Sequence, residues 1–120
     1  MAAPEHSPLV IRHGDLVIDL VHYRVLRGEI PIILSYREYA LLVYLAMRAG
    51  RLVSRRQLLE EGLGRHDAGG MRTVDEHMRH LRSKLERHGV PVVEMVDGVG
   101  YRFLVQERDG PPGGPAASVL

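Results

Sequence analysis

The sequence predicts an α+β fold, in which short strands at both ends of the chain flank three helices. Residues 9–34 alternate short β-branched segments with turn residues, a pattern typical of antiparallel strands. Residues 35–87 carry apolar positions at helical spacing behind helix-start signals. Residues 92–105 contain two strand-like segments on either side of Asp97-Gly98, a favoured hairpin turn.

The size and composition are those of one globular domain. The chain has 120 residues, of which 45 % are hydrophobic and 26 % are charged, and its formal net charge is +1. Cysteine is absent, which excludes disulfides and thiolate metal sites. The first residues lack the pattern of a secretory signal, and the longest apolar run, residues 40–47, is too short to cross a bilayer. We therefore expect a cytoplasmic protein with no membrane partner.

The domain is expected to span residues 9–106, between a flexible tail at 1–8 and a disordered tail at 107–120 that is rich in proline and glycine. Between Leu9 and Leu34, segments such as LVIR, LVID, RVLR and IPIIL predict a four-stranded antiparallel sheet. Pro31 has no amide hydrogen to donate, so the last of these strands should lie at an edge of the sheet.

Two helix starts are marked by capping boxes, each of which stabilises a helix by about 1 kcal/mol. Ser35 and Glu38 begin the first helix, and Ser54 and Gln57 begin the second. Hydrophobic staples accompany both boxes. Gly62, Gly64, Gly69 and Gly70 then predict a flexible loop over residues 62–71.

The third helix is expected to begin near Thr73, where Thr73 and Glu76 offer another capping box, and to run to about Arg87. One face is apolar and consists of Val74, Met78, Leu81 and Leu85. The opposite face consists of Arg72, Glu76, Arg79, His80, Ser83 and Arg87. A helix with a basic outward face, followed by a hairpin, is the layout of a winged helix-turn-helix, which indicates binding to duplex DNA. The competing interpretation is an ordinary solvated helix face.

Three blocks, LSYREYALLVYLAMRAGRLVSRRQLL, RTVDEHMRHLRSKLE and VDGVGYRF, resemble the OmpR/PhoB-type effector domain of bacterial response regulators. They occur in the order and at the spacing of that family, over roughly residues 9–105. The resemblance implies that the third helix enters the major groove and that the wing hairpin lies near the minor groove. Only about 35 residues precede the first helix, fewer than a receiver domain needs, so we expect a stand-alone effector without control by its own phosphorylated aspartate.

The resemblance also implies the residues and partners of the site. The expected DNA-binding residues are Arg55, Arg56, Arg72, Thr73, Glu76, His77, Arg79, His80, Arg82, Ser83, Lys84, Gly98, Tyr101 and Arg102. RNA polymerase is expected to contact the loop before the third helix, through Gly64, Arg65, His66 and Asp67. Head-to-tail pairing on tandem DNA half-sites and a location in the bacterial nucleoid are implied as well.

Two acidic residues depart from a simple basic surface. Glu76 has two interpretations, a helix cap through Thr73, which the sequence favours, or acceptance of a hydrogen bond from cytosine N4. Asp97 occupies the wing tip, where arginine is common in the resembled family, and there it favours the hairpin turn. His80 replaces a frequent arginine, and its titration near neutrality raises the possibility of pH-sensitive binding.

Other classes of function remain open. A protein-interaction module that has lost its DNA face is the main alternative, with RNA polymerase or a sensor protein as partner. His77 and His80 have the i, i+3 spacing of two zinc ligands, but no third ligand has an assured place beside them. No nucleophile motif, carboxylate pair or phosphate-binding glycine loop is present. We therefore expect no enzymatic activity, no metal and no cofactor.

Overall fold

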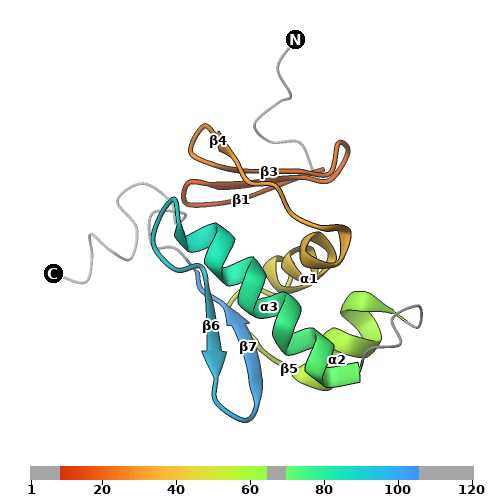
Figure 1. Ribbon diagram of the computed structural model, residues 1–120. Coiled ribbons are helices and arrows are strands. Elements are labelled where there is room, and N and C mark those ends of the chain that lie inside the picture. Colours follow the sequence, from red (N-terminus) through yellow and green to blue (C-terminus); the bar gives the residue numbers. More distant parts are fainter. Residues whose placement is uncertain (1–8, 65–69, 106–120) are drawn as a thin grey trace, which may run out of the picture.

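The computed structural model describes residues 9–64 and 70–105 of the chain. The predicted tails at 1–8 and 107–120, and Arg65, His66 and Asp67 of the predicted polymerase-contact loop, lie outside the described residues. In the described ranges, two antiparallel sheets flank a layer of helices (Figure 1). This is the α+β arrangement that the sequence predicts.

The N-terminal sheet has the four strands expected from the sequence. β1 (Val10–His13), β2 (Leu16–Asp19), β3 (Arg24–Arg27) and β4 (Ile30–Pro31) pair in chain order, each antiparallel to the next. Leu16 and Ile18 alternate along β2 and are fully buried, so this face of the sheet packs on the helices. Pro31 lies in the edge strand β4, which confirms the prediction from its missing amide hydrogen.

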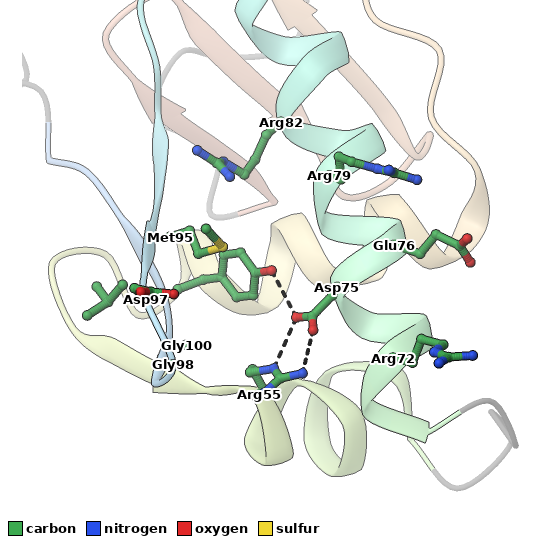
Figure 2. A pocket seen from close by; sticks show the side chains of 12 residues that line it. Arg55, Arg72, Asp75, Glu76, Arg79, Arg82, Met95, Asp97, Gly98 and Gly100 are labelled. Carbon is green, nitrogen blue, oxygen red and sulfur yellow. Dashed lines mark hydrogen bonds and ion pairs between the residues drawn. The ribbon is translucent and has the colours of Figure 1, made fainter.

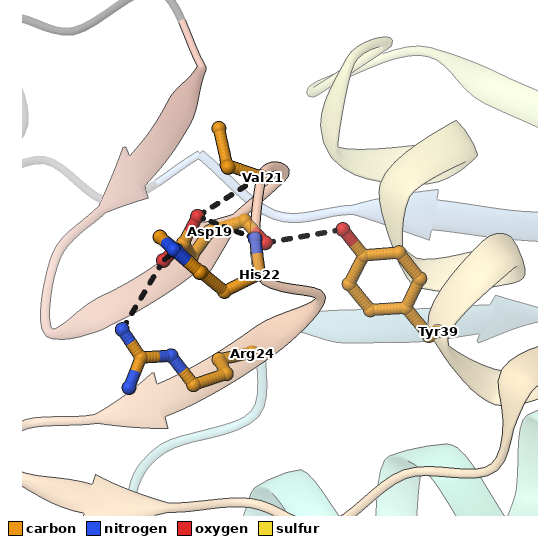
Figure 3. A network of polar contacts seen from close by, with 5 residues as sticks. All are labelled: Asp19, Val21, His22, Arg24 and Tyr39. Carbon is orange, nitrogen blue, oxygen red and sulfur yellow. Dashed lines mark hydrogen bonds and ion pairs between the residues drawn. The ribbon is translucent and has the colours of Figure 1, made fainter.

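The turn between β2 and β3 is organised by Asp19 (Figure 3). Its carboxylate accepts hydrogen bonds from the backbone amides of Val21 at 2.9 Å and His22 at 3.1 Å, and Arg24 Nη2 lies 3.4 Å away. Burial opposes ionisation of this group, but the hydrogen bonds from His22 and Val21 lower the pKa of Asp19 to about 2. Tyr39 donates its hydroxyl to the Asp19 carbonyl oxygen at 3.3 Å, which links the turn to the first helix.

α1 (Tyr36–Ala46) begins at the predicted capping box. The Ser35 hydroxyl accepts a hydrogen bond from the Glu38 amide at 3.1 Å, and the Glu38 carboxylate accepts one from the Ser35 amide at 2.9 Å. Leu41, Leu42 and Leu45 are fully buried, so α1 forms the centre of the core.

The second helix differs from the expected α-helix. α2 (Arg55–Gln57) starts at the predicted Ser54 cap, but the chain continues as a π-helix, η1 (Leu58–Leu63). Gly62 packs against α1 there, and a Cβ at this position would lie 3.3 Å from a methyl carbon of Leu41. The wider π turn and the missing side chain let the two helices approach closely. Residues 62 and 63 are therefore helical, and the predicted loop over 62–71 is too long at this end.

α3 (Gly70–Glu86) begins before the predicted start near Thr73. Gly70 has a φ of +75°, and Met71 and Arg72, which are good helix formers, extend the helix upstream. Thr73 therefore lies within the helix, and the predicted capping box of Thr73 and Glu76 is wrong. The predicted loop is also too long at this end.

The wing is a three-stranded sheet rather than a hairpin alone. β6 (Val93–Val96) and β7 (Gly100–Phe103) form the predicted hairpin, and β5 (Leu52–Ser54) pairs with the other side of β7. β5 is three residues long and directly precedes the α2 cap, so the sequence pattern gave no separate signal for it. At the tip the turn contains the predicted Asp97-Gly98 pair, and Gly98 has a positive φ of +74°.

The C-terminal end of α3 is attached to the N-terminal sheet by Arg27. This side chain is 2 % exposed, and its Nη1 donates to the carbonyl oxygens of Leu85 at 3.1 Å and Val90 at 2.7 Å. Its Nε and Nη2 donate to Asp15 at 3.2 and 2.9 Å. The buried charge of Arg27 is thus compensated by Asp15, and the side chain provides hydrogen bonds to two carbonyl oxygens near the end of the helix.

Candidate nucleic-acid interface

The outward face of α3 is exposed as the helical periodicity predicts. Val74, Met78, Leu81 and Leu85 are fully buried against the core. The exposed residues on the other face are Arg72, Glu76, Arg79, His80, Ser83 and Glu86. Figure 2 shows the side chains of Arg72, Glu76 and Arg79 leaving the same side of the helix. α3 therefore presents a surface of mixed charge to solvent along its whole length.

A groove runs between this face of α3 and the wing, with a volume of about 610 Å³. Its helical side includes Arg72, Asp75, Glu76, Arg79 and Arg82, and its other sides are formed by Arg55, Met95, Val96, Asp97, Gly98, Gly100 and Tyr101. The groove brings together the third helix and the wing tip, the two segments in which the sequence places the DNA contacts.

Asp75 organises the floor of the groove (Figure 2). Its carboxylate accepts a hydrogen bond from Arg55 Nε at 3.1 Å and one from the Tyr101 hydroxyl at 3.0 Å, and Arg55 Nη2 forms a second ion-pair contact. Burial, reinforced by the hydrogen bond to Asp75, raises the pKa of Tyr101 to about 12. The start of α2, the third helix and the wing strand β7 are thus joined through one carboxylate.

Several cations in the predicted site have partners within the fold. Arg55 is paired with Asp75, Arg56 Nη1 lies 3.2 Å from Glu60, and Lys84 Nζ donates to Glu38 at 2.7 Å. Lys84 therefore points toward the start of α1, and neither Lys84 nor Arg56 lines the groove. The resemblance alone could not reveal these pairs, because their partners are acids on the same or a neighbouring helix.

The cations that line the groove from α3 are different. Within the described ranges, Arg72, Arg79 and Arg82 make no ion pair, and the buried Arg82 Nε has no hydrogen-bond partner. Arg72 and Arg79 are exposed and Arg82 is half-buried. Three guanidinium groups on one side of the groove are thus available for an anionic ligand.

The remaining predicted residues are more scattered. Thr73 and His77 are half-buried on the flanks of α3, whereas His80 and Ser83 are exposed. Tyr101 lines the groove but is only 2 % exposed, and its hydroxyl donates to Asp75. Arg102 lies on β7 opposite Leu52 and Glu94, and it does not line the groove. Gly98 is at the wing tip, between the exposed Asp97 and Val99.

Asp75 and Gly100 are among the groove residues that are absent from the predicted DNA-binding set, with Met95, Val96 and Asp97. A Cβ at Gly100 would collide with the backbone of Val53 and Ser54 on β5, so this glycine permits the pairing of β5 with β7. The partners of Asp75 lie 20 and 26 residues away, and no local pattern joins them. In both cases the signal is a tertiary contact, which a single sequence does not contain.

Other kinds of site are not evident in the described ranges. His77 and His80 belong to no group of three or more histidine, aspartate or glutamate side chains that could hold a metal ion there. Among the helices of residues 9–64 and 70–105, none has both the length and the hydropathy required to cross a bilayer.

Three helices, an N-terminal four-stranded sheet and a hairpin beside the last helix define a winged helix-turn-helix domain. The family described as "Transcriptional regulatory protein, C terminal" matches residues 29–103. The chain therefore belongs to this family, which is the OmpR/PhoB type of DNA-binding domain. Membership also confirms the prediction that the chain is not an enzyme.

Known proteins resemble the chain over most of its length. The transcriptional regulatory protein SrrA of Staphylococcus aureus is 38 % identical over 109 residues, covering 88 % of this chain and 45 % of SrrA. The structure of the Klebsiella pneumoniae RstA DNA-binding domain in complex with the RstA box is 32 % identical, with a TM-score of 0.68, and covers 79 % of this chain and 96 % of that one.

The response regulator DrrB, a Thermotoga maritima OmpR/PhoB homolog, is 31 % identical with a TM-score of 0.70, covering 80 % of this chain and 44 % of DrrB. The chain thus spans less than half the length of the curated relatives it matches.

Proposed function

We propose that the chain is a sequence-specific regulator of transcription that binds double-stranded DNA, with α3 in the major groove and the wing near the minor groove. The observation that carries the proposal is that Arg72, Arg79 and Arg82 line the groove between α3 and the wing and make no ion pair with any residue in the described ranges. The neighbouring Arg55, Arg56 and Lys84 are engaged in ion pairs, whereas these three guanidinium groups are available for phosphates and base edges.

The dimensions of α3 suit the major groove. Its 17 residues extend about 25 Å, at about 1.5 Å per residue, and its exposed face is continuous from Arg72 to Ser83. A major groove about 12 Å wide admits one such helix. The related RstA DNA-binding domain has been solved in complex with the RstA box, which supports DNA binding by the same fold in this chain.

The experiment is a salt titration of binding to duplex DNA. Each phosphate contact contributes about −0.9 to the slope of log K against log salt concentration. Arg72→Ala and Arg82→Ala should each make the slope shallower by about one unit and weaken binding to duplex DNA. Arg56→Ala is the matched control, because Arg56 is an arginine of the same module that is paired with Glu60 outside the groove.

An equal loss of salt dependence in all three variants would contradict the assignment of the groove. Absence of duplex binding by the unmodified chain at low salt would contradict the function itself. It would favour the alternative of a protein-interaction module, for which the exposed carboxylates of Glu76 and Asp97 on the same surface are the supporting observation.

RNA polymerase as a second partner, head-to-tail pairing on tandem half-sites and location in the nucleoid are further parts of the proposal. Of the four residues of the expected polymerase contact, the structure describes Gly64. It follows the last residue of η1 and has a φ of +80°. Pairing on adjacent half-sites would raise the affinity of a weakly basic module through avidity. Selection on duplexes with one and two half-sites tests the pairing directly.

A further inference from the structure

Glu76 occupies the centre of the exposed face of α3. Arg72 lies one helical turn before it and Arg79 one turn after it, and the three side chains leave the helix on the same side (Figure 2). All three are exposed, and Glu76 makes no hydrogen bond or ion pair within the described ranges. A carboxylate is thus presented without a partner between two guanidinium groups.

The fold offers this carboxylate no structural role. Because α3 begins at Gly70, Glu76 lies well within the helix and does not serve as the capping partner of Thr73. The neighbouring acid, Asp75, takes the internal role by binding Arg55 and Tyr101. On a surface that faces phosphates, a carboxylate without a partner repels the DNA backbone and so weakens binding to every DNA sequence alike.

A carboxylate in the major groove gains a partner at only some base pairs. It can accept a hydrogen bond from the amino group of cytosine N4 or adenine N6. Adenine presents the acceptor N7 beside its amino group, and that acceptor repels a carboxylate. Cytosine presents a carbon-bound hydrogen beside N4, so cytosine is the better partner for Glu76.

Arg79 extends the contact to a neighbouring base pair. Positions 76 and 79 are separated by about 4.5 Å along the helix axis, which is close to the stacking distance of about 3.4 Å between base pairs. Arginine recognises guanine through O6 and N7. We propose that Glu76 selects a cytosine in each half-site, at or next to a base pair whose guanine is bound by Arg79. This inference rests on the proposed function, and it specifies which base pairs the same surface of α3 recognises.

The test is selection of bound sites from a random duplex pool with the full chain and with two variants at position 76. The unmodified chain should select sites with one strongly preferred cytosine. Glu76→Gln should change that preference to adenine, because an amide can donate to N7 while it accepts from N6. Glu76→Ala should lose the preference at that position and bind non-cognate duplexes more tightly, because the repulsion is gone.

The discrimination between cytosine and other bases should fall by roughly 5- to 150-fold in Glu76→Ala, the range of a good base contact. Glu29→Gln is the matched control, because it removes an exposed carboxylate between β3 and β4, which does not line the groove, and should leave the cytosine preference intact. Circular dichroism confirms that each variant is folded.

Identical base preferences in the unmodified chain and both Glu76 variants would overturn the inference and leave the proposed function in place. Loss of the cytosine preference in Glu29→Gln as well would overturn the assignment to Glu76. If the unmodified chain enriches no duplex, the proposed function fails, and this inference fails with it.

Discussion

The guanidinium group of Arg27 fills the space that a side chain at Gly89 would occupy. An ideal Cβ on Gly89 would collide with Nη2 of Arg27 and lie 3.0 Å from its Nε. Gly89 has no positive φ, so glycine is required here for the close approach of Arg27 and not for a special backbone conformation. The contact is the point at which the N-terminal sheet and the end of α3 meet.

Gly89→Ala should therefore destabilise the domain by about 1–3 kcal/mol, the usual cost of forcing extra volume into a packed site. The measurement is the free energy of unfolding in denaturant. In an Arg27→Ala background the same change should be neutral or stabilising by about 0.4–1 kcal/mol, since alanine restricts the unfolded chain. An equal cost in both backgrounds would show that Arg27 is not the cause.

Asp75→Asn should weaken the connection between α3 and the wing. The substitution removes a negative charge that binds Arg55 and helps to raise the pKa of Tyr101. The pKa of Tyr101 should therefore fall from about 12 toward the usual value of 10.0. The titration of a carbon-13-labelled Tyr101 ring measures the shift. Thermal stability should fall as well, because Arg55 loses its partner in the fold.

A matched comparison separates this contact from general surface effects. Arg55→Ala should destabilise the domain more than Arg56→Ala, because Arg55 makes a bidentate pair with Asp75 whereas Arg56 pairs with Glu60 in an exposed i, i+4 contact. Exposed helix pairs of this kind contribute about 0.3–0.5 kcal/mol. Equal effects of the two changes on unfolding would argue against Asp75 as an organising residue.

Lys84 and Glu38 make stability depend on pH in the acid range. Burial alone would raise the pKa of Glu38, but hydrogen bonds from the Lys84 ammonium and the Ser35 amide lower it below 4.5. A carboxyl whose pKa is depressed in the folded state stabilises the fold above its unfolded pKa, and this contribution is lost as the pH falls through the folded pKa. The unmodified chain should therefore keep this contribution to below pH 4.5.

Lys84→Met should abolish or reverse this acid loss of stability, since burial then dominates and raises the pKa of Glu38, so that the folded state binds the proton more tightly than the unfolded chain. Unfolding free energy measured against pH detects the change. The salt dependence of DNA binding should stay as in the unmodified chain, because Lys84 points to α1 and not into the groove. A shallower salt dependence in Lys84→Met would show instead that Lys84 contacts a DNA phosphate.

Gly100→Ala should disrupt the wing. The new Cβ would collide with the carbonyl oxygen of Val53 and lie 2.9 Å from Ser54 Cα, and backbone atoms cannot move aside as a flexible side chain can. We expect a loss of about 3 kcal/mol or more and faster hydrogen exchange of the β5 and β7 amides. Stability near that of the unmodified chain would show that β5 can separate from β7 at little cost.

The sequence predicted most of the fold because its signals are local. Ser35 with Glu38 and Ser54 with Gln57 mark helix starts that the structure confirms, and Pro31 marks an edge strand. The Thr73–Glu76 pattern has the same form but fails, because the residues before it also favour helix. The π turns of η1 depend on the packing of Gly62 on α1, which no local pattern reports.

The candidate site was harder to predict than the fold. Periodicity correctly placed Glu76, Arg79 and His80 on the exposed face of α3. Charge alone could not tell Arg79, which is unpaired in the described ranges, from Lys84, which is paired with Glu38. That difference depends on which acids the fold brings near each cation, and it determines the electrostatics of the surface.

The matched family segment begins at residue 29, two positions after Arg27. A fragment cut at that boundary would keep all the helices and the wing of the described structure but lose β1, β2 and β3, and with them the guanidinium group on the Leu85 and Val90 carbonyl oxygens. The buried end of α3 would then face water. We therefore expect the smallest autonomous folding unit to be longer than the segment by which the family is recognised, with its N-terminal boundary before Asp15.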